Sequence, residues 1–476
     1  MADKQIQLYY KNVMADAIGH EHGITTQQLN ELAKQTTPLI PRIKDEIISG
    51  NSRYGLLPGN PQIAKDVKRL VKQFKPKCEN LVVLGIGGSA LGNIALQTAL
   101  NPYAYNLDNN KRKGPRLFVF DNVDPSQFGS FLALITPRLG HTIFNVISKS
   151  GQTAETASQF MIVYKMLESR FGRGKLKDRI IATTDAQKGT LRKIATDAGL
   201  STLEVPDGVG GRFSVLSAVG LFSAAMCGIN IDKLLAGARD MHARVTNPDF
   251  FKNPAAVNAA IQYHYYNRGK KISVMMPYSY ALYSMADWYR QLWAESLGKR
   301  YDLKGNEVYI GPTPVKALGA TDQHSQVQLY REGPNDKVFT LLEVQNHGKK
   351  LKIPASPKSA PELSYLARKD MGELLNAEKK ATEYALCASN RPCITILFPK
   401  VDAYTVGQFI FLFEATTSFT GALLGVNTYD QPAVELGKHA TFALMGKSGD
   451  YKEGKSYAEF ADEIRAKTEI DAEFII

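Results

Sequence analysis

The chain has 476 residues, of which 44% are apolar and 22% are charged. This balance is typical of a globular protein and excludes a disordered or fibrous chain, and the length suffices for two or three domains. The net charge of +12 favours anionic partners such as nucleic acid, acidic membranes or phosphorylated metabolites. No apolar run approaches the roughly 20 residues that a membrane-spanning helix needs, so no membrane partner is expected.

The beginning of the chain, "MADKQIQLYYKNV", lacks the basic and then apolar regions of a secretory signal, so we expect a cytoplasmic protein. The four cysteines show no CxxC spacing and are expected to be reduced thiols. "HEH" at residues 20–22 lacks the HExxH spacing that places two imidazoles on one helical face, so no metal site is expected. Basic–aromatic motifs and zinc-finger spacings are missing as well, which argues against a nucleic-acid partner.

Apolar, β-branched runs alternate with helical stretches along most of the chain. In the first half the runs are "LVVLGIGGS", "RLFVFDNVD", "TIFNVISKS" and "RIIATTDAQ", and in the second half "KISVMMPYS", "VFTLLEVQN" and "CITILFPKV". Strands that alternate with helices predict an α/β fold, with mostly parallel sheets covered by helices on both faces.

The pattern divides the chain into four segments. We expect a helical N-terminal segment at residues 1–74, a first α/β domain at 75–240, a second at 255–440 and a charged C-terminal tail at 441–476. The similar order of strands and helices in the two halves indicates a duplicated domain. In open parallel sheets, ligands bind at the carboxyl ends of the strands.

"GIGGSALG", residues 85–92, follows the first strand and begins a helix. Glycines there allow a ligand to approach the backbone, and the amides at a helix N-terminus favour an anion. The loose GxGxxG/A pattern also fits a dinucleotide site, but Asp121 lies farther away than the roughly 20 residues expected of a ribose-binding acid. A turn that only packs a strand against a helix is the structural alternative.

"SKSGQTAET", residues 148–156, follows the third strand with a cluster of hydrogen-bond donors. Ser148, Ser150 and Thr153 each carry a hydroxyl, and Lys149 adds a positive charge. A phosphate dianion has several acceptor oxygens and no donor, so the cluster suits phosphate, and the helix that follows directs its free amides outward. A helix cap with incidental serines is the alternative.

The second half contains candidates for acid–base chemistry. In "QLWAESLGK", Gln291 and Glu295 are four residues apart and therefore share one helical face. The neighbouring Trp293 and Leu297 provide an apolar setting that would suit a general base. The alternative is a surface glutamate on a helix.

Four more side chains could belong to the same site. His324 lies among polar residues in "GATDQHSQ", and Arg212 lies in the glycine-rich "GVGGRFSVLS", where a guanidinium could reach an oxyanion. Gln431 and Lys438 are nearly two helical turns apart and could face one site together. Their alternatives are a loop histidine, an arginine paired at the surface and a solvated lysine.

Taken together, these motifs resemble the glucose-6-phosphate isomerase family. The matching stretches are "GIGGSALG", "SKSGQTAET", "GGRFSVLS", "QLWAESLGK", "DQHS" and "DQPAVELGK". The resemblance implies two sugar-isomerase (SIS) type domains, conversion of glucose 6-phosphate to fructose 6-phosphate in glycolysis and gluconeogenesis, and no cofactor. One departure is Ala433, where the family usually has glycine.

The resemblance also implies roles for individual residues. Glu295 would move a proton between C2 and C1 of the open sugar, and Arg212 would stabilise the cis-enediolate. His324 and Lys438 would open the ring, with His324 contributed by the second subunit of a homodimer. The residues implied to bind the substrate are Gly88, Ser89, Ser148, Lys149, Ser150, Thr153, Gln291 and Gln431.

Three rival interpretations stay open at this point. A non-catalytic SIS-type sensor of sugar phosphates explains the first-half loops but leaves Glu295, His324 and Lys438 without a task. A dinucleotide-dependent oxidoreductase would follow from "GIGGSA" alone. An isomerase of another phosphosugar, such as mannose 6-phosphate, would differ only in the shape of its pocket.

Overall fold

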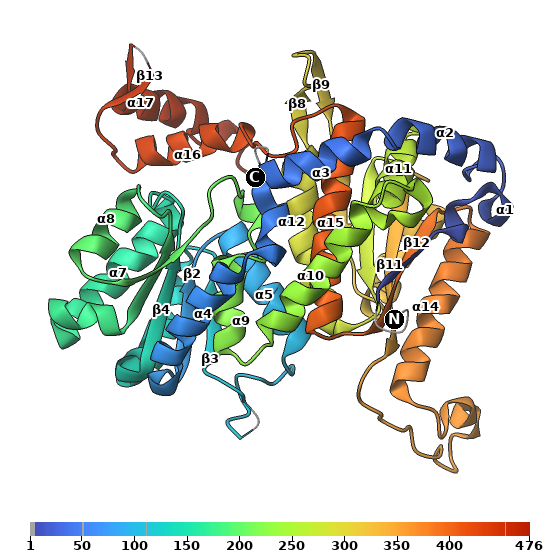
Figure 1. Cartoon of the computed structure of the whole chain (residues 1–476), viewed down its shortest axis with the longest axis horizontal. Coiled ribbons are helices and arrows are strands. Elements are labelled where there is room, and N and C mark those ends of the chain that lie inside the picture. Colours follow the sequence, from blue (N-terminus) through green and yellow to red (C-terminus); the bar gives the residue numbers. More distant parts are fainter. Residues whose placement is uncertain (1–4, 50–51, 111, 453) are drawn as a thin grey trace. The chain divides into compact units, whose positions relative to one another are not determined.

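The structure is a computed structural model that describes residues 5–49, 52–110, 112–452 and 454–476 (Figure 1). It divides into two compact units, Met1–Thr428 and Tyr429–Ile476. The first unit contains two five-stranded sheets flanked by helices, which confirms the predicted α/β fold. Among the described helices, none combines the length and the apolar character that crossing a membrane requires.

The first sheet consists of five parallel strands in the order β3-β2-β4-β5-β6. They are β2 (Asn80–Leu84), β3 (Arg116–Phe120), β4 (Thr142–Ile147), β5 (Ile180–Thr184) and β6 (Ser201–Glu204). β2, β4 and β5 are buried at every position, so their sequences are continuous apolar runs rather than alternating ones. Numbered along the chain, the strand order is 2-1-3-4-5 and reverses between β2 and β4, where such sheets bind ligands.

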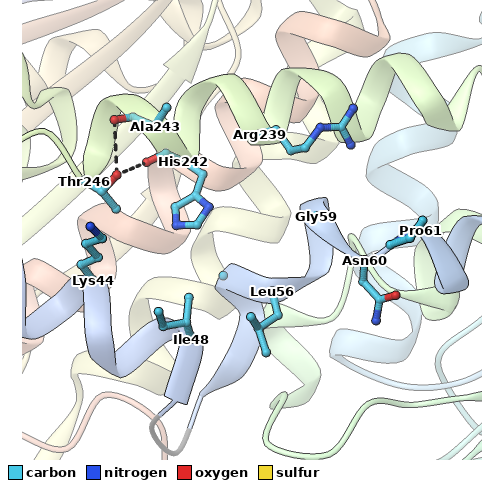
Figure 2. A pocket seen from close by; sticks show the side chains of 11 residues that line it. Lys44, Ile48, Leu56, Gly59, Asn60, Pro61, Arg239, His242, Ala243 and Thr246 are labelled. Atoms are coloured by element: carbon cyan, nitrogen blue, oxygen red, sulfur yellow. Dashed lines mark hydrogen bonds between the residues drawn. The ribbon is translucent and has the colours of Figure 1, made fainter.

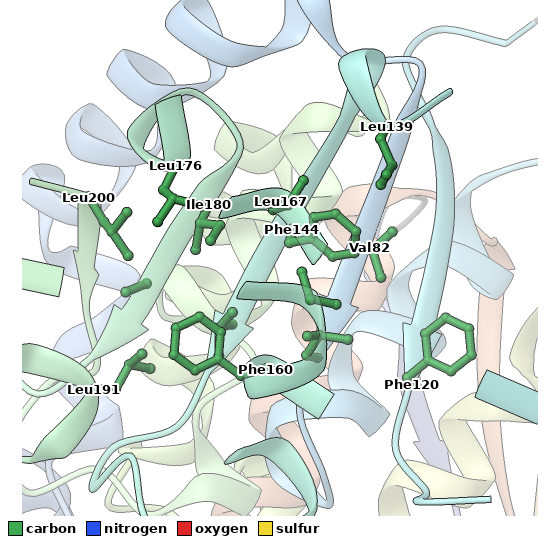
Figure 3. Close-up of a cluster of buried hydrophobic side chains, with 14 of the residues drawn as sticks. Val82, Phe120, Leu139, Phe144, Phe160, Leu167, Leu176, Ile180, Leu191 and Leu200 are labelled. Atoms are coloured by element: carbon green, nitrogen blue, oxygen red, sulfur yellow. The ribbon is translucent and has the colours of Figure 1, made fainter. Parts of the chain in front are cut away.

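Helices cover both faces of this sheet (Figure 1). They are α4 (Pro61–Phe74), α5 (Gly88–Leu100), α6 (Pro125–Ile135), α7 (Ala154–Phe171), α8 (Thr190–Asp197) and α9 (Ala218–Met226). Figure 3 shows the apolar cluster between the sheet and α6, α7 and α8. Phe144 and Ile180 of the strands belong to this cluster together with Phe160 and Leu167 of α7.

The second sheet has the order β1-β12-β11-β7-β10. Its strands are β1 (Gln7–Tyr9), β7 (Ile272–Pro277), β10 (Thr313–Lys316), β11 (Lys337–Asn346) and β12 (Cys393–Lys400). The last four are parallel, whereas β1 joins β12 in the antiparallel direction. β1 lies in the segment that we expected to be helical, and its three residues are too few to show a strand period in the sequence.

The N-terminal segment otherwise consists mainly of helices. It contains α1 (Ala15–Ile18), α2 (Thr26–Thr36), α3 (Leu39–Ser49) and the 3-10 segment η3 (Arg53–Gly59), followed by α4. Later in the chain come α10 (Ile231–Val245), α11 (Pro254–Asn267), α12 (Tyr283–Leu297), α13 (Val327–Glu332), α14 (Met371–Ala388) and α15 (Ala403–Leu424). Two further strands, β8 (Lys299–Tyr301) and β9 (Glu307–Ile310), pair with each other as an antiparallel hairpin.

Helix α15 runs through the interior of the first unit and packs on α10 at backbone distance. A Cβ atom on Gly237 would lie 1.8 Å from the carbonyl oxygen of Tyr404, and one on Gly407 would lie 1.9 Å from that of Leu234. These two glycines therefore permit the close crossing. The first turn of α15 is fixed by Asp402, whose side chain accepts hydrogen bonds from the backbone N–H groups of the first turn.

The second unit is small and has an apolar cluster of its own. It contains α16 (Ala433–Leu444), the two-stranded sheet β13 (Asp450–Lys452) and β14 (Lys455–Ser456), and α17 (Tyr457–Thr468). Ala443, Tyr457 and Phe460 are among the residues that form the cluster. Much of the charged tail expected at residues 441–476 is thus folded, and the domain boundaries drawn from the sequence stay predictions.

Candidate active site

The glycine loop at the end of β2 lies against a second glycine-rich loop. Gly87 precedes α5 with a φ of +57°, and a Cβ atom on Gly88 would lie 2.1 Å from the carbonyl carbon of Gly211. The glycines at 87 and 88 are therefore required by backbone conformation and by close approach. As a result, the "GIGG" segment touches the loop that carries Arg212.

The serine loop lies between β4 and α7. Ser148 Oγ accepts a hydrogen bond from the backbone N–H of Gly151 at 3.0 Å and lies 3.3 Å from Thr153 Oγ1. Ser150 Oγ accepts from the N–H of Gln152 at 3.1 Å. Thr153 is the N-cap of α7, but its side chain makes no capping hydrogen bond. This geometry does not support the alternative in which the loop is only a helix cap.

The two loops lie at the same edge of the first sheet, because β2 and β4 are parallel neighbours. A Cβ atom on Gly85 would lie 2.8 Å from Cβ of Ser89 and 3.4 Å from Cβ of Ile147, the residue before Ser148. The hydroxyl donors and the glycine amides therefore flank the point at which the strand order reverses. Lys149 is exposed nearby and pairs with Asp207 at 3.4 Å.

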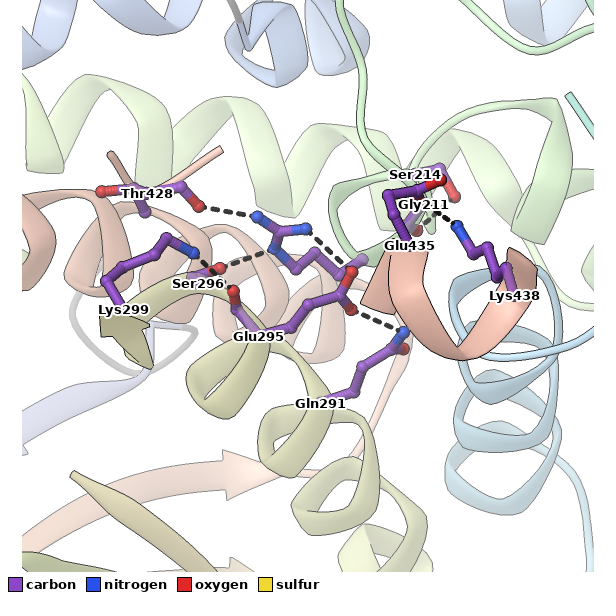
Figure 4. Close-up of polar contacts among 10 residues, drawn as sticks. Gly211, Ser214, Gln291, Glu295, Ser296, Lys299, Thr428, Glu435 and Lys438 are labelled. Atoms are coloured by element: carbon purple, nitrogen blue, oxygen red, sulfur yellow. Dashed lines mark hydrogen bonds and ion pairs between the residues drawn. The ribbon is translucent and has the colours of Figure 1, made fainter. Parts of the chain in front are cut away.

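Arg212 is a buried cation with several partners. Figure 4 labels three of them, Glu295, Ser296 and Thr428. Its side chain is 1% exposed, and Nη1 donates to Glu295 Oε1 at 3.0 Å. Nε donates to Ser296 Oγ at 2.7 Å, and Nη2 donates to the carbonyl oxygen of Thr428 at 2.7 Å. A buried guanidinium requires such pairing, since an uncompensated charge would be strongly destabilising. The alternative of a surface-paired arginine is therefore wrong.

Glu295 lies in the last turn of α12 and faces the glycine loop through Gln291. Gln291 Nε2 donates to Glu295 Oε2 at 3.0 Å, as the spacing of four residues predicts. A Cβ atom on Gly87 would lie 2.9 Å from the same Nε2. Glu295 is 26% exposed, so its carboxylate is reachable from solvent while it is paired with Arg212. The first-half loop and the second-half carboxylate therefore lie close together, with Gln291 between them.

The immediate surroundings of the carboxylate differ from those expected. Trp293 and Leu297 are buried, at 1% and 0% exposure, but residues two positions from Glu295 point to other faces of the helix. The carboxylate is instead surrounded by the polar groups of Arg212 and Gln291. Ordinary helical geometry explains this difference.

Three further predicted residues, His324, Lys438 and Gln431, lie on other elements of the chain. His324 is exposed in a 3-10 segment, Thr321–His324, while the preceding Gln323 donates to Tyr278 Oη at 2.9 Å. Lys438 lies on α16 in the second unit and pairs there with Glu435 Oε1 at 2.7 Å. Gln431 lies just before α16 in the same unit.

Sequence reasoning missed two partners of Arg212. Ser296 is 0% exposed and directly follows Glu295, so its position in "AESLGK" was a signal that could have been used. The other partner is the backbone carbonyl of Thr428, which no sequence pattern identifies. In the described part of the chain, no three side chains of the metal-binding types lie together.

These features define an α/β protein in which loops rich in glycine and hydroxyl groups lie near a paired carboxylate and guanidinium. Residues 71–457 match the model of the phosphoglucose isomerase family. Glucose-6-phosphate isomerase of Carboxydothermus hydrogenoformans is 49% identical over 81% of this chain and 82% of its own length. That of Rubrobacter xylanophilus is 44% identical over 90% of this chain and 96% of its own.

The chain therefore belongs to the phosphoglucose isomerase family, whose members interconvert glucose 6-phosphate and fructose 6-phosphate. Solved structures agree in fold. A hypothetical protein of Thermus thermophilus superimposes with a TM-score of 0.81 at 32% identity, covering 93% of this chain and 100% of that chain. Glucose-6-phosphate isomerase of Chlamydia trachomatis gives 0.78 at 20% identity, covering 93% and 88%.

Proposed function

We propose that this chain interconverts glucose 6-phosphate and fructose 6-phosphate by ring opening and a cis-enediol intermediate. The observation that carries the proposal is the Glu295 carboxylate, which pairs with buried Arg212 at 3.0 Å and contacts Gln291 beside Gly87. Proton transfer between adjacent carbons requires one carboxylate that reaches both carbons and a cation for the oxyanion. It requires no electron acceptor, because the sugar is only rearranged.

In this proposal the phosphate binds between the two loops at the end of the first sheet. The hydroxyls of Ser148, Ser150 and Thr153 donate to it, and Lys149 adds a positive charge. The glycine loop contributes backbone amides at Gly88 and Ser89, at the N-terminus of the 13-residue helix α5. Binding the far end of the sugar in this way would position C1 and C2 for the acid–base step.

Glu295 then removes the proton from C2 of the open aldose and returns it to C1. A positioned base of this kind contributes about 10² to 10⁴ in rate. Arg212 stabilises the negative oxygen of the enediolate, an effect worth roughly 3 kcal/mol in comparable sites. Gln291 and Gln431 hold sugar hydroxyls. Gln291 Oε1 has no hydrogen-bond partner among the described residues.

Ring opening is assigned to His324 and Lys438. The exposure of His324 is compatible with its contribution to the site of a second subunit, and the functional assembly in this proposal is a homodimer in the cytoplasm. The proposed domains are residues 75–240 for phosphate binding and 255–440 for the base, between the helical N-terminal segment 1–74 and the tail at 441–476. Membership of the family favours this isomerase over the sensor and the oxidoreductase.

The test is a coupled assay of the purified chain on fructose 6-phosphate with a chelator present. We expect turnover that the chelator does not reduce. A panel that includes mannose 6-phosphate would separate the remaining alternative. If the chain binds fructose 6-phosphate but does not isomerise it, the proposal is wrong and the sensor interpretation is favoured; preference for mannose 6-phosphate would change the substrate.

A further inference from the structure

A cavity of about 710 Å³ lies between α3, the 3-10 segment η3 and α10 of the first unit (Figure 2). None of the residues assigned to the candidate active site lines it. Its volume falls in the range of roughly 300–1,000 Å³ that is typical of sites for small molecules.

Two basic side chains from different helices face this cavity. Figure 2 shows Lys44 of α3 and His242 of α10 directed toward the same space. Burial lowers the pKa of His242, and the Lys44 ammonium lowers it further, as expected for two groups that lie close together. Within the described part of the chain, neither Lys44 Nζ nor the His242 ring has a hydrogen bond or an ion pair.

The cationic lining is not balanced by acidic groups. No aspartate or glutamate is among the described residues that line the cavity, whereas Arg239 lines its other end. Arg239 Nη1 donates to the carbonyl oxygen of Pro58 at 2.7 Å, which fixes the guanidinium at the wall. An adjoining cavity of about 510 Å³ shares Arg239 and adds Lys65, Lys68 and Asp232, and Lys68 and Asp232 pair there at 2.7 Å.

The surface between these cations is apolar. Ile48 of α3 and Leu56 of η3 line the side opposite α10, and Leu56 is 47% exposed. On the other side the His242 ring packs against Phe411 of α15, with ring centroids 5.0 Å apart, which holds the imidazole in place. A ligand that fits this lining would combine an anionic head with an apolar body.

We propose that this cavity binds a small organic monophosphate. The phosphate of the ligand would lie between Lys44 and His242, and its apolar part would lie against Ile48 and Leu56. Lysine is a common phosphate ligand, and an imidazole N–H can donate to a second phosphate oxygen. Bound phosphate would compensate these two basic groups, for which the described residues provide no hydrogen bond or ion pair. The site is separate from the loops proposed to bind the sugar phosphate.

The experiment uses phenyl phosphate as a probe of the full chain, observed by ligand-detected NMR. Fructose 6-phosphate is present at saturation, so that the proposed active site is occupied. We expect saturable binding of phenyl phosphate, at least tenfold weaker binding of inorganic phosphate, and no binding of benzyl alcohol. Equal affinities for phenyl phosphate and inorganic phosphate would overturn the apolar part of the proposal.

Lys44→Glu is the deciding variant, and Lys34→Glu is its matched control. Both lysines are exposed on N-terminal helices, so each variant should fold and retain the isomerase rate of the wild type. We expect Lys44→Glu to weaken phenyl phosphate binding at least tenfold and Lys34→Glu to change it less than twofold. The proposal is overturned if the wild type shows no saturable binding or if the two variants behave alike.

Discussion

The two sheets of the first unit share the order of four of their five strands but differ in the segments that follow these strands. The first sheet has the order 2-1-3-4-5 along the chain, and β10-β7-β11-β12 repeats 2-1-3-4 in the second. The fifth position is taken by β6 in the first sheet and by the antiparallel β1 in the second. Because the two sheets are built alike, the difference in chemistry between them comes from the loops and helices that follow their strands.

In the first sheet, β2 and β4 end in short loops of glycine and hydroxyl residues that lead directly into α5 and α7. In the second sheet, β7 leads through a 3-10 segment, Tyr280–Leu282, into α12, and the acid is in the last turn of that helix. The glycine and serine loops, proposed to bind phosphate, come from one half, and the Glu295 carboxylate comes from the other. They meet where Gln291 approaches Gly87.

The largest loss of activity is expected when the Glu295 carboxylate, which comes from the second half, is replaced. Glu295→Gln keeps the shape of the side chain but cannot accept the C2 proton, so we expect kcat to fall by about 10² to 10⁴. Binding of the sugar phosphate should change little, because the phosphate loops are intact. Steady-state kinetics and calorimetry measure the two effects, with the exposed Glu332→Gln as control. Retention of kcat would contradict the assignment of the base.

A second variant alters the contact between the glycine loop and the loop that carries Arg212, both of which belong to the first half. Gly88→Ala would place a Cβ atom 2.1 Å from the carbonyl carbon of Gly211, so one backbone must move. Since overpacking typically costs about 1–3 kcal/mol, we expect kcat/KM to fall by roughly tenfold or more. Gly129→Ala in α6 is the control, since a Cβ atom there meets nothing within 4 Å. Similar kinetics for the two variants would show that the contact is unimportant.

A third variant examines how the acid and the cation are held together. Ser296→Ala removes the acceptor for Arg212 Nε and leaves a buried donor without that partner, at a cost of about 1–3 kcal/mol. We expect kcat to fall roughly tenfold with KM nearly unchanged, because Ser296 would position Arg212 rather than touch the sugar. Ser284→Ala on the same helix, which removes a hydrogen bond to Thr98, is the control. A change confined to KM would argue against this positioning role.

The smallest effect concerns stability and the buried helix α15. Burial raises the pKa of Glu414 well above 4.5, and neither carboxyl oxygen has a partner in the described chain. The folded state thus keeps a proton that the unfolded state releases, so this contribution to stability is present below pH 4.5 and is lost as the pH rises toward the folded pKa.

Glu414→Gln removes this dependence on pH. We expect its melting temperature to exceed that of the wild type by about 2 °C at pH 8 and to match it near pH 4. Thermal unfolding at both values measures the effect, and the exposed Glu31→Gln should show no such difference. An equal shift at both pH values would indicate a packing effect instead of proton linkage.

Features that depend on a short stretch of sequence, such as buried strands and neighbours on one helix, could be predicted. Continuous apolar runs identified β2 and β4, and a spacing of four residues placed Gln291 beside Glu295. The pair of Arg212 and Glu295 could not be derived from spacing, because 83 residues separate them and only the packed halves bring them together. The family resemblance, rather than local physics, connected them in advance.

Other features lay beyond sequence patterns for physical reasons. A backbone carbonyl such as that of Thr428 carries no side-chain signal, and β1 is too short for one. The cavity at Lys44 and His242 depends on the packing of α3 on one side and α10 on the other, which no local window contains. The positions of Gln431 and Lys438 at the site stay predictions.

The most direct test of the account is a crystal structure with 6-phosphogluconate, an open-chain acid whose phosphate is at the opposite end from C1. We predict that its phosphate contacts Ser148, Ser150 and Thr153. We also predict that C1 and C2 lie next to the Glu295 carboxylate. A phosphate bound in the serine loop with the C1 end directed away from Glu295, in every subunit, would contradict the account.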